Sequence, residues 1–188
     1  CLPGVGPKSA RRMVLHLLEK DPEGGKSLSK SLLNTLESVG QCVKCRIFSE
    51  EEICHICSNT KRDSNIICIV ETVSDVFAIE ESNQYKGCYF ILHGNLSPID
   101  NMGPDEIGLD QLFKAVKEDE VEEIILATNS TIEGEATAHF IFDCMKDISS
   151  LKITRLARGV PLGGELEYVD GGTIMHALSR RVNLNKPE

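Results

Sequence analysis

The stretch ATNSTIEGEAT, residues 127–137, follows an apolar run at 124–127 and leads into a helix expected to begin at about Glu133. A short apolar run followed by a helical segment is typical of a strand–loop–helix unit. Glu133 and Glu135 lie in the first turn of that helix, where acids interact favourably with the helix dipole. A third acid, Glu71, ends an earlier apolar run, IICIVE. Since functional groups of parallel sheets collect at the carboxyl ends of strands, these three carboxylates are expected to lie near one another.

From residue 65 onward the chain alternates between short apolar runs and helical segments. Strands are expected at 66–70, 89–92, 123–127 and 152–156, and helices at about 74–81, 109–118, 133–146 and 174–179. Such alternation implies right-handed crossovers, and therefore a mostly parallel sheet with helices on both faces. The expected fold class is α/β.

This part of the chain resembles the Toprim domain of topoisomerases, primases and related nucleases. Those enzymes carry Asp-x-Asp before Glu-Gly-Glu, and one more glutamate after an earlier strand. Their convergent carboxylates hold Mg²⁺, which neutralises charge that develops on a phosphoryl group. Here the neutral residues Asn129 and Thr131 stand at the two aspartate positions. The resemblance therefore implies a Toprim fold that has stopped doing chemistry, with Glu71, Glu133 and Glu135 left to hold Mg²⁺ at most weakly.

Composition and charge restrict the class of protein. The formal net charge of −9 argues against a generally basic nucleic-acid-binding coat. Charge is uneven, however: residues 1–41 hold six Lys and Arg against four acids, residues 42–64 four against four, and residues 65–188 ten against twenty-one. Any nucleic-acid contact is therefore expected near the amino-terminal end. No apolar run approaches the roughly 20 residues of a membrane span and no signal peptide is visible, so we expect no membrane contact and a cytoplasmic location.

The amino-terminal residues LPGVGPK precede a helix expected at about 8–18. Gly4 and Gly6 allow a tight turn and a close approach of the backbone to a ligand. Free N–H groups at the helix start, with Lys8 and Arg12 one turn apart, would form a phosphate-binding corner. This resembles the second half of a helix-hairpin-helix motif whose first helix would precede the first residue. An ordinary capped helix with solvated cations is the alternative, and the motif alone does not decide between them.

A second helix is expected at about 26–39, and both amino-terminal helices carry an apolar face. The residues of these faces are Ala10, Met13, Val14, Leu17 and Leu18 in the first helix and Leu28, Leu32, Leu33, Leu36 and Val39 in the second. We expect the apolar face of the second helix to be its inner face.

Two Cys-x-x-Cys pairs form the strongest metal signal: Cys42 with Cys45, and Cys54 with Cys57. Four thiolates at this spacing can surround one Zn²⁺ tetrahedrally, and a full quartet leaves no position for a water, so the metal is expected to be structural. His55 could compete as a ligand. Disulfides or a redox pair are the alternatives, but a second matching pair without a secretion signal favours zinc. The remaining cysteines at 68, 88 and 144 are expected to be buried thiols.

In their order, LPGVGPKSARRM, CVKC with CHIC, IICIVE, ILATNSTIEGEAT and ARGVPLGGELEYVDGG resemble the RecR family of bacterial recombination mediators along essentially the whole chain. The resemblance implies a non-enzymatic factor in gapped-DNA repair, located at the nucleoid. It implies action with RecO, and in many bacteria RecF, to place RecA on single strands covered by single-strand binding protein. It also implies a ring-shaped homotetramer formed from dimers, which is able to encircle DNA.

The resemblance further implies a role for particular residues. The implied DNA contacts are Gly4, Gly6, Lys8 and Arg12; the zinc ligands are Cys42, Cys45, Cys54 and Cys57; and the acids at the RecO contact are Glu133 and Glu135, with Glu71 beside them. The implied domains are a helix-hairpin-helix region at 1–41, a four-cysteine zinc finger at 42–64, a Toprim domain at 65–160 and a Walker-B-like oligomerisation segment at 161–188. No phosphate loop accompanies that last segment, so nucleotide hydrolysis is not inferred. Arg180 and Arg181 would face DNA or suit a helix C-terminus.

Two rival functions stay open at this stage. The first is a metal-dependent nuclease or primase-like enzyme that uses Glu71, Glu133 and Glu135. It is disfavoured by the neutral Asn129 and Thr131 and by the lack of an evident nucleophile. The second is a zinc-stapled scaffold that binds only protein, which would predict no DNA association.

Overall fold

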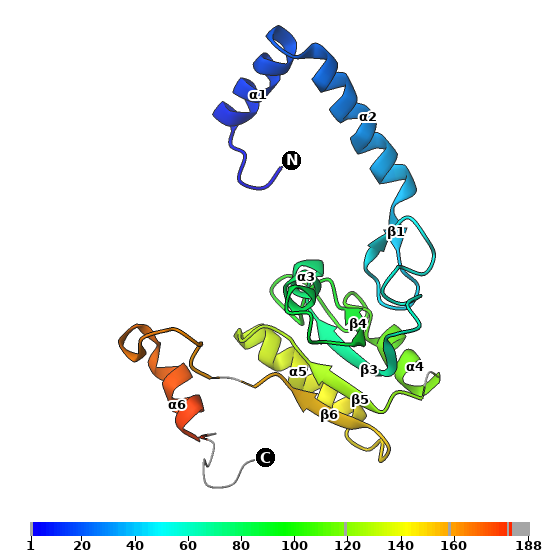
Figure 1. Ribbon diagram of the computed structural model, residues 1–188, viewed down its shortest axis with the longest axis vertical. Helices are drawn as coiled ribbons and strands as arrows, with labels where there is room; N and C mark the ends of the chain where they lie inside the picture. Colours follow the sequence, from blue (N-terminus) through cyan, green and yellow to red (C-terminus); the bar gives the residue numbers. More distant parts are fainter. Residues whose placement is uncertain (1, 119, 158, 180, 182–188) are drawn as a thin grey trace. The chain divides into compact units, whose positions relative to one another are not determined.

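The computed structural model describes residues 2–118, 120–157, 159–179 and 181 (Figure 1). It divides into two compact units, Cys1–Thr60 and Lys61–Glu188, each of which is described by itself. Within the described ranges, no helix combines the length and hydropathy that a bilayer span requires.

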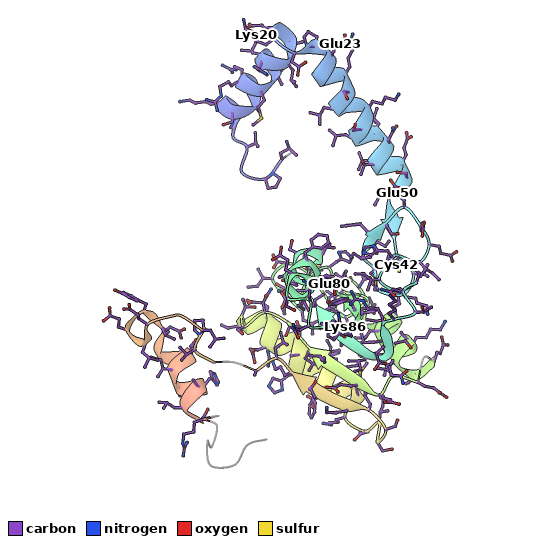
Figure 2. All side chains as sticks on the ribbon, in the orientation of Figure 1. Lys20, Glu23, Cys42, Glu50, Glu80 and Lys86 are labelled. Atoms are coloured by element: carbon purple, nitrogen blue, oxygen red, sulfur yellow. The ribbon has the colours of Figure 1, made fainter. Side chains whose placement is uncertain are left out.

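The first unit begins with two helices, α1 (Pro7–Glu19) and α2 (Pro22–Ser38). α2 begins four residues before its predicted start because Asp21 accepts a 2.9 Å hydrogen bond from the Gly24 N–H and caps the helix, with a proline following at the first helical position. The prediction that α2 presents an inner face is wrong for this single chain, since α2 contains no buried residue, and neither does α1. Figure 2 shows their side chains spread around both helices. Eight apolar side chains are exposed by 46–80%: Met13, Val14, Leu15, Leu18, Leu28, Leu32, Leu33 and Leu36.

The zinc-finger segment follows α2 and contains only two very short strands, β1 (Gly40–Gln41) and β2 (Phe48–Ser49), which pair antiparallel. Ladders of two residues cannot hold a fold by themselves, and a segment this short buries little apolar surface. The stability of this segment must therefore come from an interaction that links its cysteine side chains.

The second unit is an α/β domain around a four-stranded, all-parallel sheet, which confirms the predicted fold class. The strands are β3 (Asp63–Val70), β4 (Gly87–Ile91), β5 (Glu123–Leu126) and β6 (Lys152–Arg155), in the order β4-β3-β5-β6. The helices are α3 (Val73–Glu81), α4 (Leu109–Glu118), α5 (Ile132–Met145) and α6 (Gly171–Ser179), with a 3₁₀ turn at Leu166–Tyr168. Because the strands are parallel, the loops that follow them all lie at one edge of the sheet, at the carboxyl ends of the strands.

Helices cover both faces of this sheet, as predicted. One face packs on α4 and α5 through a core that contains Ile67, Ile69, Phe90, Leu92, Ile124, Leu126, Leu109, Leu112, Val116, Ala138, Ile141 and Met145. Residues of opposite parity on β3, such as Cys68 and Val70, face the other side, where Val76 of α3 is fully buried. Cys88 is half-buried, and the expectation of a buried thiol is wrong for Cys144, which α5 presents to solvent.

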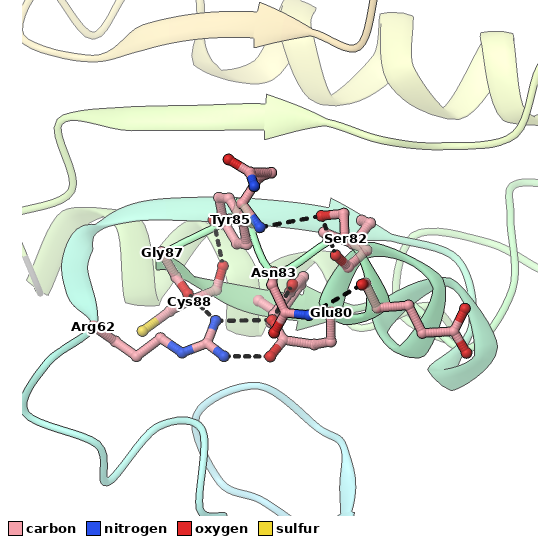
Figure 3. A network of polar contacts seen from close by, with 11 residues as sticks. Arg62, Glu80, Ser82, Asn83, Tyr85, Gly87 and Cys88 are labelled. Atoms are coloured by element: carbon pink, nitrogen blue, oxygen red, sulfur yellow. Dashed lines mark hydrogen bonds and ion pairs between the residues drawn. The ribbon is translucent and has the colours of Figure 1, made fainter. Parts of the chain in front are cut away.

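A polar network fastens the amino ends of the strands (Figure 3). The Arg62 guanidinium donates to both carboxylate oxygens of Glu80 and, over 3.1 Å, to the Gly87 carbonyl. Tyr89 donates its hydroxyl to the same carboxylate over 2.5 Å. The hydrogen bond from Arg62 lowers the pKa of Glu80, and burial raises the pKa of Tyr89. The network ties β3, β4 and α3 together at the edge opposite the loops that carry the carboxylates.

Candidate functional site

The four predicted zinc ligands lie together. The Sγ atoms of Cys42, Cys45, Cys54 and Cys57 are all within 4.8 Å of one another, and within the described residues they form the one group of His, Cys, Asp or Glu side chains with metal-ligand spacing. Three of these cysteines are exposed by 1–2% and Cys57 is half-buried. His55 is exposed and lies outside the group, so no fifth ligand is needed.

Backbone geometry brings the first pair of thiols together. Arg46 adopts a left-handed conformation with φ 65°, which lets the chain double back after Cys45. The Arg46 N–H then donates to the Cys42 carbonyl over 2.9 Å, and the Cys42 N–H donates to the Ile47 carbonyl over 2.8 Å. The Cys54 N–H points at the Cys42 sulfur over 3.3 Å. Backbone donors directed at sulfur are suited to a thiolate rather than a neutral thiol.

The donor set fits Zn²⁺. A hydrogen bond from Cys57 is the main cause that lowers the pKa of Cys45 to about 6, whereas burial raises the pKa of Cys54 to about 11. Buried thiolates so close together repel one another unless a cation lies between them, and four sulfurs satisfy tetrahedral Zn²⁺ with no open position. The site is therefore a structural zinc centre, where the ion would stabilise the fold and supply no reaction.

The amino-terminal hairpin has the geometry of a phosphate-binding corner. Gly4 has φ 75°, a conformation that favours glycine, and Gly6 is the N-cap of α1. No side chain caps α1, so N–H groups of its first turn point outward. Lys8 and Arg12 are exposed on this helix, one turn apart. Arg11 is also exposed. It lies three residues after Lys8, which places the two side chains next to each other on the helix surface, although Arg11 was not among the predicted DNA contacts.

Glu71 directly follows β3 and is buried, exposed by 3%. Its Oε1 accepts the Asn129 backbone N–H over 2.8 Å, and its Oε2 accepts the side-chain amides of Asn129 and Asn95 over 2.9 and 3.2 Å. Asn95 was not anticipated, because it lies 24 residues from Glu71 in a loop. Little of this carboxylate is accessible in the single chain, and the predicted contact of Glu71 with a partner protein stays a prediction.

Steric crowding explains why position 134, between Glu133 and Glu135, is a glycine. A Cβ on Gly134 would lie 2.2 Å from the Asn129 carbonyl oxygen and 2.7 Å from Oε1 of Glu71, too close for any side chain. Thr131 caps α5 by accepting the Gly134 N–H over 3.1 Å, while Thr128 donates to the Gly134 carbonyl over 2.9 Å. The start of α5 is thus packed directly onto the Glu71 carboxylate.

The other two acids of the motif differ from Glu71 and from each other. Glu135 receives a two-pronged ion pair from Arg155 at the end of β6, with one N–O distance of 2.7 Å. Glu133 is exposed, and within the described residues its carboxylate has no hydrogen-bond or ion-pair partner. The three carboxylates therefore do not converge on a common point as Mg²⁺ ligands do, and the residues present do not fit that ion.

The segment after the sheet differs in detail from its prediction. α6 begins at Gly171, three residues early, because Asp170 accepts the Thr173 N–H over 2.9 Å. Arg181 donates to the Leu178 carbonyl over 3.1 Å, as suits a helix C-terminus, while Arg180 lies outside the described residues.

Family models match four consecutive parts of the chain. They are described as the RecR helix-hairpin-helix at residues 1–36, the RecR four-cysteine zinc finger domain at 39–59, the Toprim domain at 65–157 and the RecR C-terminal segment at 159–182. The zinc centre and the Glu71 region lie inside the second and third of these matches.

Full-length relatives agree with the family models. The chain is 57% identical to the recombination protein RecR of Saccharophagus degradans over 96% of this chain and 91% of that protein. It is 50% identical to the recombination protein RecR of Coxiella burnetii over 97% of this chain and 90% of that protein, and 51% identical to that of Methylococcus capsulatus over 96% and 91%. Identity at this level along nearly the whole of both chains, with four matched segments in one order, shows that the chain belongs to the RecR family.

Proposed function

We propose that this chain is a non-enzymatic, DNA-binding recombination mediator. Membership of the RecR family supports the general role, in DNA recombination and repair. In the finer proposal it acts in gapped-DNA repair at the nucleoid, with RecO and RecF, to help load RecA onto single strands covered by single-strand binding protein. A ring-shaped homotetramer formed from dimers is the proposed working state.

The observation that carries the non-enzymatic part is the bonding of the Toprim acids. Glu71 is buried under three neutral donors, and Glu135 is bound to a guanidinium. Phosphoryl-transfer enzymes of this fold need charged ligands that converge on a metal, because the metal neutralises the transition state. Incubation of gapped DNA with the pure protein and Mn²⁺ should leave the DNA intact. Turnover that disappears in Glu133→Gln would establish the nuclease or primase alternative instead.

The DNA-binding part is supported by the geometry of α1. Its uncapped first turn supplies N–H donors, and exposed cations lie beside them on a unit with more Lys and Arg than acids at residues 1–41. Backbone donors and point charges recognise phosphate but read no base edge. We therefore propose that Gly4, Gly6, Lys8 and Arg12 contact the DNA backbone without sequence preference.

We expect Lys8→Ala/Arg12→Ala to weaken binding equally for unrelated DNA sequences. The slope of log affinity against log salt should also become shallower by roughly 0.7 per lost contact on single strands and roughly 0.9 on duplex DNA. Fluorescence anisotropy across a salt series measures both quantities. The matched control is Lys26→Ala/Lys30→Ala on α2, which removes the same charge from exposed positions away from the hairpin. Equal losses in both variants would show that net charge, rather than the hairpin, binds DNA.

The zinc ligands and the partner surface complete the proposal. Cys42, Cys45, Cys54 and Cys57 hold the zinc that shapes the segment between α2 and β3. RecO is proposed to dock at the exposed start of α5, where Glu133 offers an uncompensated negative charge. The second unit carries the excess of acids, and such a field attracts basic partners while it repels DNA from that surface.

A further inference from the structure

We infer that Arg155 takes the place of the divalent cation in this Toprim domain. The inference rests on the fold and goes beyond the proposed function, because it explains what stabilises the former metal site when no metal is bound. Its basis is the position of Arg155, its two bonds to Glu135 and the separate bonding of Glu71.

Arg155 reaches the correct place because of sheet register. It is the last residue of β6 and pairs in register with Leu126, the last residue of β5. The loop after β5 leads directly to α5, so the carboxyl end of β6 lies beside the first turn of that helix. This is the edge where the carboxylates of a parallel sheet gather. The positive charge of Arg155 therefore lies at the edge of the sheet where a bound cation would otherwise have to balance the carboxylates.

The ion pair is well formed and partly shielded. Side-chain exposures are 25% for Arg155 and 32% for Glu135, and the two terminal guanidinium nitrogens, Nη1 and Nη2, each donate to one carboxylate oxygen. A planar fork matched to a carboxylate is stronger and more directional than a single exposed contact. Since both oxygens of Glu135 are occupied, Mg²⁺ would have to displace the guanidinium before it could bind.

Glu71 offers no easier route for an ion. Its two oxygens already accept three hydrogen bonds from Asn129 and Asn95, and Gly134 packs against it. Mg²⁺ gives up water reluctantly and prefers several charged oxygen ligands. Groups of the protein itself therefore occupy both carboxylates: neutral amides hydrogen-bond Glu71, and the guanidinium supplies the counter-charge for Glu135. An Arg155 that served only as an ordinary surface ion pair would leave cation binding unchanged when it is removed.

Mn²⁺ titration of the intact, zinc-loaded protein, followed by electron paramagnetic resonance, distinguishes these possibilities. Arg155→Gln should gain a Mn²⁺ site whose affinity is at least about tenfold higher than that of any site in the wild type. The reason is that the guanidinium no longer competes with Mn²⁺ for the Glu135 carboxylate. Arg155→Lys keeps a cation beside Glu135 and should gain no such site. Arg155→Gln/Glu135→Gln should lose the gained site again.

Two results would overturn the inference. One is a folded Arg155→Gln protein, with a wild-type melting temperature, that gains no Mn²⁺ site. The other needs no Arg155 variant: a Mn²⁺ site in the wild type that disappears in Glu135→Gln would show that the guanidinium does not exclude cations. DNA and RecO binding are separate readouts, so failure here leaves the proposed function unaffected.

Discussion

At the scale of single residues, two substitutions relative to the Toprim enzymes account for the character of the site. Asn129 donates two hydrogen bonds to a buried carboxylate that aspartate would repel. Thr131 uses its hydroxyl to cap α5. Both residues therefore have structural tasks at positions where the enzymes have metal ligands. The amide and the hydroxyl satisfy neighbouring groups directly, and no ion has to lie between them.

Asn129→Asp should destabilise the second unit by about 3 kcal/mol, because a carboxylate would replace a donor to a buried acid. Like charges raise the pKa of one of the pair, so the loss should be full near neutral pH and should shrink as the solution is acidified through the range where that carboxyl protonates. Urea unfolding at several pH values measures this. Asn129→Ala is the control, since it removes the side-chain donor without adding charge. A loss for Asn129→Asp that is independent of pH would exclude charge repulsion as the cause.

Glu133→Lys should lower the melting temperature only slightly, because this exposed carboxylate has no side-chain partner within the described residues and loses only its favourable interaction with the dipole of α5. If RecO docks at the start of α5, the reversal should weaken RecO binding by about tenfold through charge repulsion at the interface. Surface plasmon resonance with immobilised RecO measures the change. Glu118→Lys on α4 makes the same change of charge at an exposed position and should have little effect. Equal weakening by both would indicate general attraction to the acidic unit.

At the scale of elements, the zinc segment and the sheet obtain their stability in opposite ways. The sheet buries a continuous apolar core under α4 and α5. The segment with β1 and β2 has two-residue strands and instead gathers four thiols. For such a segment, the free energy of metal binding is largely its free energy of folding.

Cys45→Ser should therefore lose the one zinc per chain and unfold the segment around β1 and β2, while the sheet keeps its cooperative transition. Elemental analysis measures the metal, and limited proteolysis locates the unfolded segment. Cys144→Ser is the matched control, because this thiol is exposed on α5 and lies outside the cluster. Wild-type protein that contains no zinc and has four freely titrating thiols would contradict the assignment.

The elements themselves were largely predictable, and the bonding between them was not. Alternating apolar runs located β3 to β6 within a few residues, because burial on both faces leaves a strong local pattern. The starts of α2 and α6 were misplaced by four and three residues, because the capping residues Asp21 and Asp170 were not used in the prediction. The Cys-x-x-Cys spacing likewise identified the zinc cluster. Arg155 and Asn95 were missed because they lie 20 and 24 residues from their acidic partners and meet them only through strand order and loop path.

At the scale of the whole molecule, two groups of apolar side chains stand out among those that a single chain leaves exposed. One patch comprises the eight exposed side chains of α1 and α2, and the other lies beyond β6, at Leu162, Leu166, Tyr168, Met175 and Leu178, exposed by 61–104%. Clustered exposed apolar side chains are typical of association sites. Two different patches, each paired with its copy on another chain, would generate the two types of interface that the proposed tetramer formed from dimers requires.

If the chain forms the proposed tetramer through these two patches, Leu36→Glu on α2 and Met175→Glu on α6 should each reduce the solution mass from tetramer to dimer, because a buried charge in either interface is strongly unfavourable. The double variant should be monomeric. Light scattering coupled to size exclusion gives the masses. Ile99→Glu is the control, since Ile99 is exposed by 91% in a loop and belongs to neither patch. Tetramers that persist in both single variants would show that neither patch is an interface.

The contact between Glu71, Asn129 and Gly134 also has an evolutionary consequence. A descendant that regained aspartate at position 129 would place two carboxylates together while Arg155 still occupied Glu135. One that lost Arg155 first would leave the charge of Glu135 uncompensated whenever no ion was bound there. Under the proposed non-enzymatic function, each single step toward a metal site would thus pass through a less stable protein, and only coordinated changes would avoid it. The hydrogen bonds to Glu71 and the ion pair of Glu135 would then act as an evolutionary ratchet against acquiring a metal site.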